Sequence, residues 1–461
     1  MALTACATVP DAGPRPQAKA PAAYAAQASF QAPQSAWPTD RWWEAYGDAQ
    51  LDALIDEALK GSPTLAEAQA RLRTAQAQAQ QARAAELPTL RFNGQVSETE
   101  QSKNMGYPPF IQDLLPTGFK DTGRVTLDAA YDLDLFGRNR AALAAAVSQT
   151  EAVRADAAQA RLTLSSAVAQ AYADLVRLYA ERGAAAQSLK NREETRDLEV
   201  QRVANGLDTQ AELKQAEAAT PTAQADLEAI DEQILIARHR IAALLGEGPD
   251  RGLAIRPPAA PAMQAFGLPA NLTADLIGRR PDLVAARLRA EAAAKKIDAA
   301  RADFYPNVTI NAFIGQQSLG LGTLLNAGSQ IGQIGPAVTL PIFDGGRLRG
   351  AYREARADYD AAVAAYDQTL TQALQDVADA AASVQSAQRQ LAERKAALDA
   401  GEAAYQVALL RYRGGLSTYV DVLTAQNAVI GQRRAFADAQ SRAFLLDIAL
   451  VRALGGGFRS A

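Results

Sequence analysis

The pattern of apolar and polar positions along this chain changes period several times. Long stretches rich in alanine, glutamine and arginine have the composition of exposed helices. Between them lie four short segments in which apolar and polar residues alternate. One of these, "PNVTINAFIG" from Pro306 to Gly315, begins without a turn where a helical stretch ends. The pattern therefore predicts helices that run directly into strands.

The chain contains an internal repeat. Ser62 to Gly94 aligns without a gap with Arg280 to Ala312, so that Pro63 matches Pro281. Two further matches join Leu127 to Arg140 with Gly335 to Arg349, and Arg202 to Ala219 with Arg411 to Ala428. We predict one unit written twice, in the order helix, strand, strand, helix, turn, helix.

The strand segments keep their apolar residues on one face. In the third segment Val308, Ile310 and Ala312 alternate with Asn307 and Thr309. Segments of about ten residues with this pattern match transmembrane barrel strands, and strands of a soluble sandwich give the same alternation. Four strands cannot close a barrel, and lipid does not tolerate an open sheet edge. A membrane role therefore predicts that several chains share one barrel.

The helical stretches are long. About 65 residues without proline separate the second strand from Gly206, which corresponds to roughly 95–100 Å of helix, and a run of similar length separates Gly346 from Gly414. Their heptads are rich in alanine, so such helices need partners. A soluble coiled-coil scaffold is the alternative that explains these helices, but it gives the four strands no purpose.

Composition excludes several classes. The net charge of −4 without a basic block gives no reason to expect nucleic acid as a partner. With one cysteine and one histidine, the usual zinc clusters and Cys/His nucleophile pairs cannot be assembled within one chain. We expect no enzymatic activity, no cofactor and no metal. No run of about eighteen apolar residues is present, which excludes a transmembrane helix.

The single cysteine, Cys6, lies in "LTAC", which has the pattern of a bacterial lipobox. Only five residues precede it, without the charged and apolar regions of a signal peptide. The Pro/Ala-rich stretch that follows has the composition of a tether. We predict a lipidated Cys6; the alternative is an incidental thiol.

Four stretches together resemble the outer-membrane factor family, the TolC-like and OprM-like outer membrane efflux proteins. They are "WPTDRWWEAYGDAQLDALIDEALKGSPTL", "LTADLIGRRPDLVAARLRAEAAAKKIDAARADFYP", "LPIFDGGRLRGAYREA" and "RYRGGLSTYVDVLTAQ". The resemblance covers Trp37 to Leu454. The lipobox-like start is similar to the lipoprotein branch of the family, the NodT type.

The resemblance implies an α+β membrane protein. Three chains would close a twelve-stranded β-barrel in the bacterial outer membrane, continued by a long periplasmic α-helical barrel. The implied function is a passive conduit of a tripartite efflux system for drugs or other small toxic compounds. The implied partners are a periplasmic adaptor, an inner-membrane pump of the resistance-nodulation-division type, and outer-membrane lipid. A type I secretion conduit is the alternative within the family.

The family also implies site residues. The turns "ANGLDT" and "RGGLST" would form the periplasmic tip that contacts the adaptor, through Gly206, Leu207, Thr209, Gly415, Leu416, Ser417 and Thr418. Asp421, placed about two helical turns from the tip, matches an acidic ring that would gate the channel and raise the carboxylate pKa. The second acidic position is Thr424 here, so the ring departs from the family pattern. A solvated aspartate on a helix face is the alternative reading of Asp421.

The expected organisation follows from the repeat. Residues 1–36 hold the lipidation site and tether, 37–62 an equatorial segment, 247–280 a Pro-rich equatorial linker and 455–461 a tail. The first repeat spans 63–246, with strands at about 88–99 and 123–136 and a tip at about 204–210. The second spans 281–454, with strands at about 305–317 and 330–343 and a tip at about 413–419.

Overall fold

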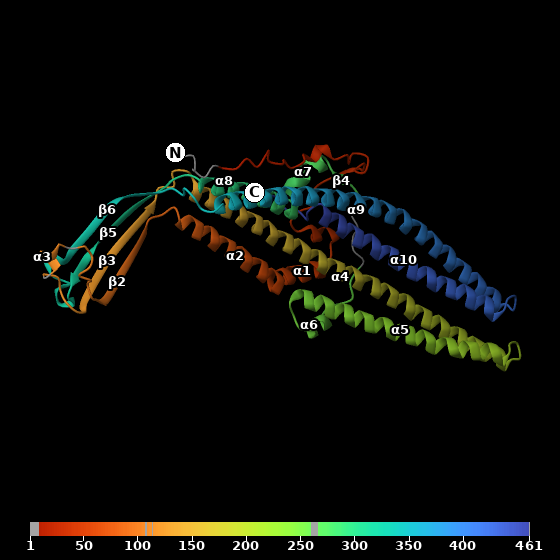
Figure 1. Ribbon diagram of the computed structural model, residues 1–461. Coiled ribbons are helices and arrows are strands. Elements are labelled where there is room, and N and C mark those ends of the chain that lie inside the picture. The colour runs from red at the N-terminus through yellow and green to blue at the C-terminus, as the bar shows by residue number, and fades with distance from the viewer. Residues whose placement is uncertain (1–8, 107, 113, 260–265, 461) are drawn as a thin grey trace. The chain divides into compact units, whose positions relative to one another are not determined.

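The computed structural model describes residues 9–106, 108–112, 114–259 and 266–460 (Figure 1). Cys6, the expected lipidation site, lies outside the described residues. The chain divides into two compact units. Unit 1 comprises Met1–Gln17, Leu72–Val153 and Arg287–Ala365, and unit 2 comprises Ala18–Arg71, Arg154–Ala286 and Tyr366–Ala461. Each is described by itself.

The predicted duplication is confirmed by the order and length of the elements. The first repeat contains α2 (Pro63–Ala84), β2 (Thr89–Thr99), β3 (Lys120–Asp132), α4 (Arg138–Ala204) and α5 (Gln210–Leu245). The second contains α8 (Pro281–Ala302), β5 (Asn307–Leu319), β6 (Gln330–Thr339), α9 (Arg347–Arg413) and α10 (Tyr419–Ala453). The helices α4 and α9 each have 67 residues, and α2 and α8 each have 22.

Shorter elements flank the repeats. They are η1 (Pro21–Ala23), β1 (Gln34–Ser35), η2 (Trp42–Tyr46), α1 (Ala49–Gly61), α3 (Pro109–Gln112), α6 (Asp250–Leu253), β4 (Leu268–Pro269), α7 (Leu272–Arg279), η3 (Leu321–Thr323) and η4 (Ala327–Ser329). Within the described residues, no helix is long and apolar enough to cross a membrane.

Unit 1 contains an antiparallel sheet in the order β2-β3-β5-β6 (Figure 1). Its register places apolar residues opposite one another, as in the row Phe92, Leu127 and Ile314. The apolar face is exposed in the single chain; its exposed members are Leu90, Phe92, Val96, Leu127, Tyr131, Ile310, Ile314, Ile334 and Val338. The predicted parity is therefore confirmed, and β2 and β6 each have one edge without a partner strand in the described chain.

Two strands end before the residues expected from sequence. The structure ends β3 at Asp132 and β6 at Thr339. Asp134 adopts a φ of 46° and accepts hydrogen bonds from the backbone N–H of Asn139 and Arg140, both at 3.0 Å. Asp344 accepts in the same way from Leu348 at 2.7 Å. These carboxylates cap the first turns of α4 and α9, so the chain leaves the sheet earlier than the alternation predicts.

The helices of unit 1 next to the sheet share a small core. Ile297, Phe304, Leu348, Tyr352 and Ala355 bury their side chains between α8 and α9. Residues 9–17, expected to belong to a tether, lie against these two helices through Val9 and several hydrogen bonds. The described part of the segment is therefore docked.

Unit 2 is built on the remaining lengths of the long helices. One core gathers Trp43 of η2, Leu54 of α1 and Tyr172 of α4 with residues of α5 and α10. A second gathers Leu276 of α7 with residues of α8, α9 and α10. The residues between the repeats and before the first repeat thus pack against the long helices.

Candidate functional site

The two helix-connecting turns of unit 2 have the same backbone. Gly206 and Gly415 have φ of 68° and 73°, the left-handed region that glycine adopts without strain. The N–H of Leu207 donates to the carbonyl of Arg202 at 2.9 Å, and that of Leu416 to Arg411 at 2.8 Å. Both turns are therefore Schellman motifs, which satisfy the last carbonyl groups of α4 and α9.

Each turn leads into a capped helix. The N–H of Thr209 donates to Glu212 at 2.7 Å, and the N–H of Thr418 donates to Asp421 at 2.9 Å. Both pairs form capping boxes at the starts of α5 and α10. The sequence signal, a threonine followed three residues later by an acid, is present in both repeats.

The leucines of the turns stay exposed. Leu207 is 64% exposed and Leu416 71% exposed. In a Schellman motif an apolar residue at this position usually contacts an apolar residue about one and a half helical turns earlier, but here the residue five positions earlier is an arginine. Gly206, Thr209, Gly415 and Thr418 are also exposed, whereas Ser417 is half-buried and its Oγ atom has no hydrogen-bond partner among the described residues. The predicted tip residues therefore lie together in their turns, with two leucines available for contact.

Asp421 lies closer to the turn than expected. It is in the first turn of α10, where the backbone N–H and the hydroxyl of Thr418 both donate to its carboxylate at 2.9 Å. These hydrogen bonds hold its pKa below the ordinary value in the single chain. The expected distance of two turns was wrong, because Thr418 is the N-cap of α10 and Asp421 is the third residue of that helix. The hydroxyl of Thr424 donates to the carbonyl of Val420 at 2.8 Å, and its side chain is exposed.

A buried polar cluster beside the first turn was missed by the sequence reasoning. The guanidinium of Arg202 pairs with Asp208 at 2.5 Å and lies 4.5 Å from the ring centre of Tyr412. The hydroxyl of Tyr412 donates to Asp208 at 2.6 Å and also contacts Glu199. The cluster thus joins α4 and the first turn to α9 of the second repeat.

The cluster strongly raises the pKa of one carboxyl group, that of Glu199. Burial, followed by the negative charge of Asp208, raises the pKa of Glu199 to about 7. Side chains of Arg202 and Asp208 are only 13% and 10% exposed. The repeat offers a sequence signal for this asymmetry, because the positions that match Glu199 and Asp208 are Ala408 and Ser417.

Three tyrosines at seven-residue spacing are buried and serve as packing residues between the helices. Tyr405, Tyr412 and Tyr419 form one cluster with Ala216, Val422 and Val429. The rings of Tyr412 and Tyr419 are 6.4 Å apart. This cluster covers the polar group around Glu199 from the side of the second repeat.

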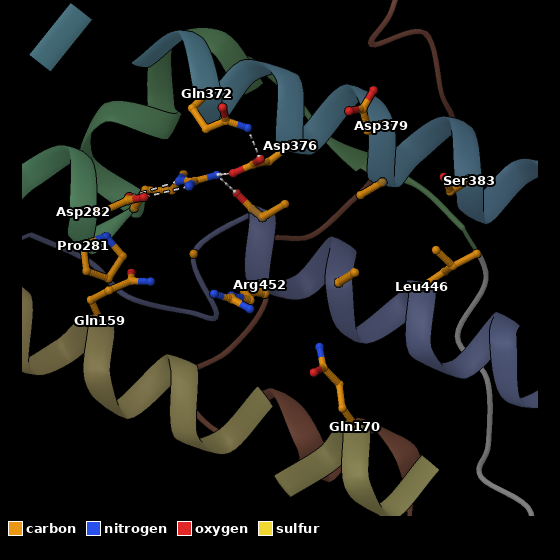
Figure 2. A pocket seen from close by; sticks show the side chains of 15 residues that line it. Gln159, Gln170, Pro281, Asp282, Gln372, Asp376, Asp379, Ser383, Leu446 and Arg452 are labelled. Atoms are coloured by element: carbon orange, nitrogen blue, oxygen red, sulfur yellow. Dashed lines mark hydrogen bonds and ion pairs between the residues drawn. The ribbon is translucent and has the colours of Figure 1, made fainter. Parts of the chain in front are cut away.

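A polar cavity of about 610 Å³ lies elsewhere in unit 2, between α4, α9 and α10 (Figure 2). At its edge Arg280 pairs with Asp282 at 2.7 Å and Asp376 at 3.0 Å, and donates to the carbonyl of Ala453 at 3.3 Å. Arginine at the C-terminal end of α10 complements the helix dipole. We interpret this group as a structural junction of α8, α9 and α10. Among the described residues, no group of three or more metal-binding side chains could hold a metal ion.

Comparison with known proteins identifies the architecture. The family model described as outer membrane efflux protein matches residues 54–247 and 272–456. The chain belongs to this family. The two matched ranges correspond to the two repeats. The duplicated unit of helices and strands is therefore the architecture that the family model matches.

Individual relatives agree with the family. The chain is 33% identical over 438 residues to the multidrug resistance outer membrane protein MdtP of Shigella flexneri, covering 93% of this chain and 88% of that protein. It is similar to the crystal structure of the outer membrane protein VceC of Vibrio cholerae, with 43% identity, a TM-score of 0.85, and coverage of 92% and 100%. It is also similar to the outer-membrane channel OprN, with 28% identity, a TM-score of 0.86, and coverage of 98% and 99%.

These comparisons decide the function at the level of the family. The protein is an outer-membrane efflux channel with an α+β fold, and the soluble scaffold alternative is wrong. None of these three relatives is described as an enzyme.

Proposed function

We propose that three copies of this efflux protein form a passive conduit that exports drugs or other small toxic compounds delivered by an inner-membrane pump through a periplasmic adaptor. The observation that carries the proposal is the sheet of unit 1. Its apolar face is exposed, and within the described residues β2 and β6 each have one edge without a partner strand. Pairing β6 of one copy with β2 of the next satisfies both edges, and three copies supply twelve strands.

The polar face of the sheet supports a water-filled interior. Asn93 donates to Asp128 at 2.8 Å, and Asn307 donates to Asp132 at 3.0 Å. In the register these residues lie on the parity opposite to the exposed apolar side chains. A barrel closed with the apolar face toward lipid would turn these polar side chains to its lumen.

The turns of unit 2 supply the proposed contact with the adaptor. Leu207 and Leu416 are exposed apolar side chains on rigid, glycine-closed turns. Rigid turns reduce the ordering cost of binding, and desolvated leucines supply apolar burial. We assign adaptor contact to Gly206, Leu207, Thr209, Gly415, Leu416, Ser417 and Thr418. Asp421, with Thr424 beside it, is assigned to the gate.

We also propose that the protein is anchored by a lipid on Cys6. Val9 packs beside Phe304 and Leu348, which flank the junction between the helices and β5 and β6. Three residues from Cys6 to Val9 span about 10 Å at most. An acyl chain on Cys6 would therefore be within reach of the membrane surface next to the sheet.

In-cell photocrosslinking tests the conduit and its partner. A photoreactive residue replaces Leu416 in one strain and Leu207 in another, and the captured protein is identified by mass spectrometry. The matched control carries the same residue at Ile236, which is 58% exposed on α5. Capture of an adaptor of a resistance-nodulation-division pump at the turns, with none at the control, supports the proposal. An adaptor of an ATP-driven exporter would replace efflux by type I secretion.

A further inference from the structure

The N-terminal segment of unit 1 is held by a buried cation. Arg356 of α9 is only 8% exposed, and its Nη2 donates to the carbonyls of Ala12 at 3.4 Å, Gly13 at 3.0 Å and Pro14 at 3.2 Å. In Figure 1 this red segment starts near the labelled N-terminus and runs beside α8 and α9. A buried guanidinium requires such acceptors because it cannot lose its proton.

The local sequence shapes the segment to fit this cation. Gly13 has a φ of 71°, and its N–H donates to the carboxylate of Asp11 at 2.9 Å. This turn directs three successive carbonyls toward one nitrogen. Pro14 and Pro16 lack an N–H, so the segment cannot add a continuous strand to another sheet. The stretch Asp-Ala-Gly-Pro is therefore preorganised for docking on Arg356.

Further contacts hold the segment on both sides of the turn. The hydroxyl of Tyr359 donates to the carbonyl of Pro16 at 3.1 Å. Arg15 pairs with Asp298 of α8 at 3.3 Å, and Val9 packs against the core between α8 and α9. The exposed Arg15–Asp298 pair contributes little, so the buried Arg356 is the central attachment.

We propose that Arg356 is the docking site of residues 9–17 and converts this segment from a flexible tether into a strut that holds Val9 next to α8 and α9. The functional consequence rests on the proposed lipid anchor at Cys6. An anchor on a free segment from Cys6 to Tyr24 would reach about 60 Å, whereas the docked segment limits it to about 10 Å from Val9. The strut therefore places the lipid beside the start of β5.

Hydrogen–deuterium exchange on the purified full-length protein tests the strut. Arg356→Gln removes the guanidinium, and Gly13→Ala strains the turn from the side of the segment, where an added Cβ meets nothing within 4 Å. We expect both variants to speed exchange of residues 9–20, in which the N–H groups of residue 13 and Lys19 donate to Asp11 and Asp367, at least about 10-fold. Arg356→Lys, which keeps the charge and three donors, is expected to restore part of the protection. Arg353→Gln, an exposed arginine of α9, is the matched control and leaves exchange unchanged.

The outcomes separate this inference from the proposed function. Equal exchange of residues 9–20 in the wild type, Arg356→Gln and Gly13→Ala would overturn the strut. Unchanged exchange of β3 confirms that each variant is folded. If Arg356→Gln does not fold, Gly13→Ala still tests the strut, because it leaves the sequence of α9 unaltered. Conductance of the reconstituted protein tests the channel separately. Protection of the segment in a protein without conductance would overturn the conduit and keep the strut.

Discussion

The two helix-connecting turns of unit 2 have one backbone and two sets of side chains. Both are closed by a left-handed glycine, followed by an exposed leucine, and lead into a capping box. Among the described residues, the charged members of the buried cluster, Arg202, Asp208 and Glu199, come from the first repeat, and the second repeat contributes Tyr412. The two repeats thus share the backbone conformation of the turn, which few sequences can form, but differ in the side chains around it.

The largest difference in the loss of stability on substitution is expected between Arg202 and Arg411, which occupy the same position of the two turns. Arg202→Met leaves the buried Asp208 and Glu199 without their cation and is expected to cost about 3–5 kcal/mol. Arg411 is exposed, its guanidinium is 3.5 Å from the carbonyl of Leu416, and Arg411→Met is expected to cost less than about 1 kcal/mol. Amide exchange at the start of α5 and of α10 measures each change locally. Equal losses would remove the distinction between the turns.

Replacing the left-handed glycine of either turn is expected to lower the stability of the protein by the same amount. Gly206→Ala and Gly415→Ala place a Cβ in the left-handed region, where the backbone penalty is about 1–2 kcal/mol, and neither Cβ meets an atom within 4 Å. Gly431→Ala is the control, because Gly431 lies inside α10 in open space, where alanine stabilises a helix by about 1 kcal/mol. Thermal unfolding measures all three. A penalty at only one turn would show that the shared geometry is not the cause.

The contributions of the two turns to folding stability should depend on pH with opposite signs. The pKa of Glu199 is raised to about 7, so its stabilising contribution is complete below its ordinary pKa of 4.5 and is lost as pH rises through about 7. Glu199→Gln should flatten this loss between pH 5 and 8. The pKa of Asp421 is lowered, so its contribution is present above its ordinary pKa of 3.8 and is lost as pH falls through the lowered value. Melting temperatures of Glu199→Gln and Asp421→Ala across pH 3–8 test both signs; a parallel change in these two variants would contradict them.

The smallest structural effect is expected at Asp421. Asp421→Ala removes one capping interaction, yet in the proposed trimer it also removes one charge from each copy near the channel axis. We expect higher passive conductance in planar bilayers and weaker block by divalent cations. Glu212→Ala, the matching cap of the first turn, is the control and should leave conductance unchanged. Unchanged conductance and block in Asp421→Ala would remove the gate assignment.

Much of this fold could be predicted from sequence because its signals are periodic and occur twice. The strand parity of Val308, Ile310 and Ala312 and the helix starts at Pro63 and Pro281 follow from local pattern. Strand ends were less predictable, since Leu135 and Ile342 continue the apolar alternation beyond the strands, while Asp134 and Asp344 cap helices. Local alternation does not distinguish a strand from such a cap.

Only part of the candidate site could be predicted from the sequence, because some of its contacts join residues far apart in the chain. Gly206, Leu207, Gly415 and Leu416 belong to short motifs that the sequence shows directly. The contact between Glu199 and Tyr412 joins residues 213 positions apart, and no local pattern specifies it. Arg356 was missed likewise, because its acceptors are backbone carbonyls more than 340 residues away.

The open sheet of unit 1 has a consequence for the cell that makes this protein. A newly made chain that formed β2, β3, β5 and β6 before meeting its partners would display an apolar face and two unpaired strand edges to water. Such surfaces template aggregation. In the proposed trimer, completion of the sheet would therefore coincide with assembly, and the chain would have to be kept from exposing these edges before it meets the other copies.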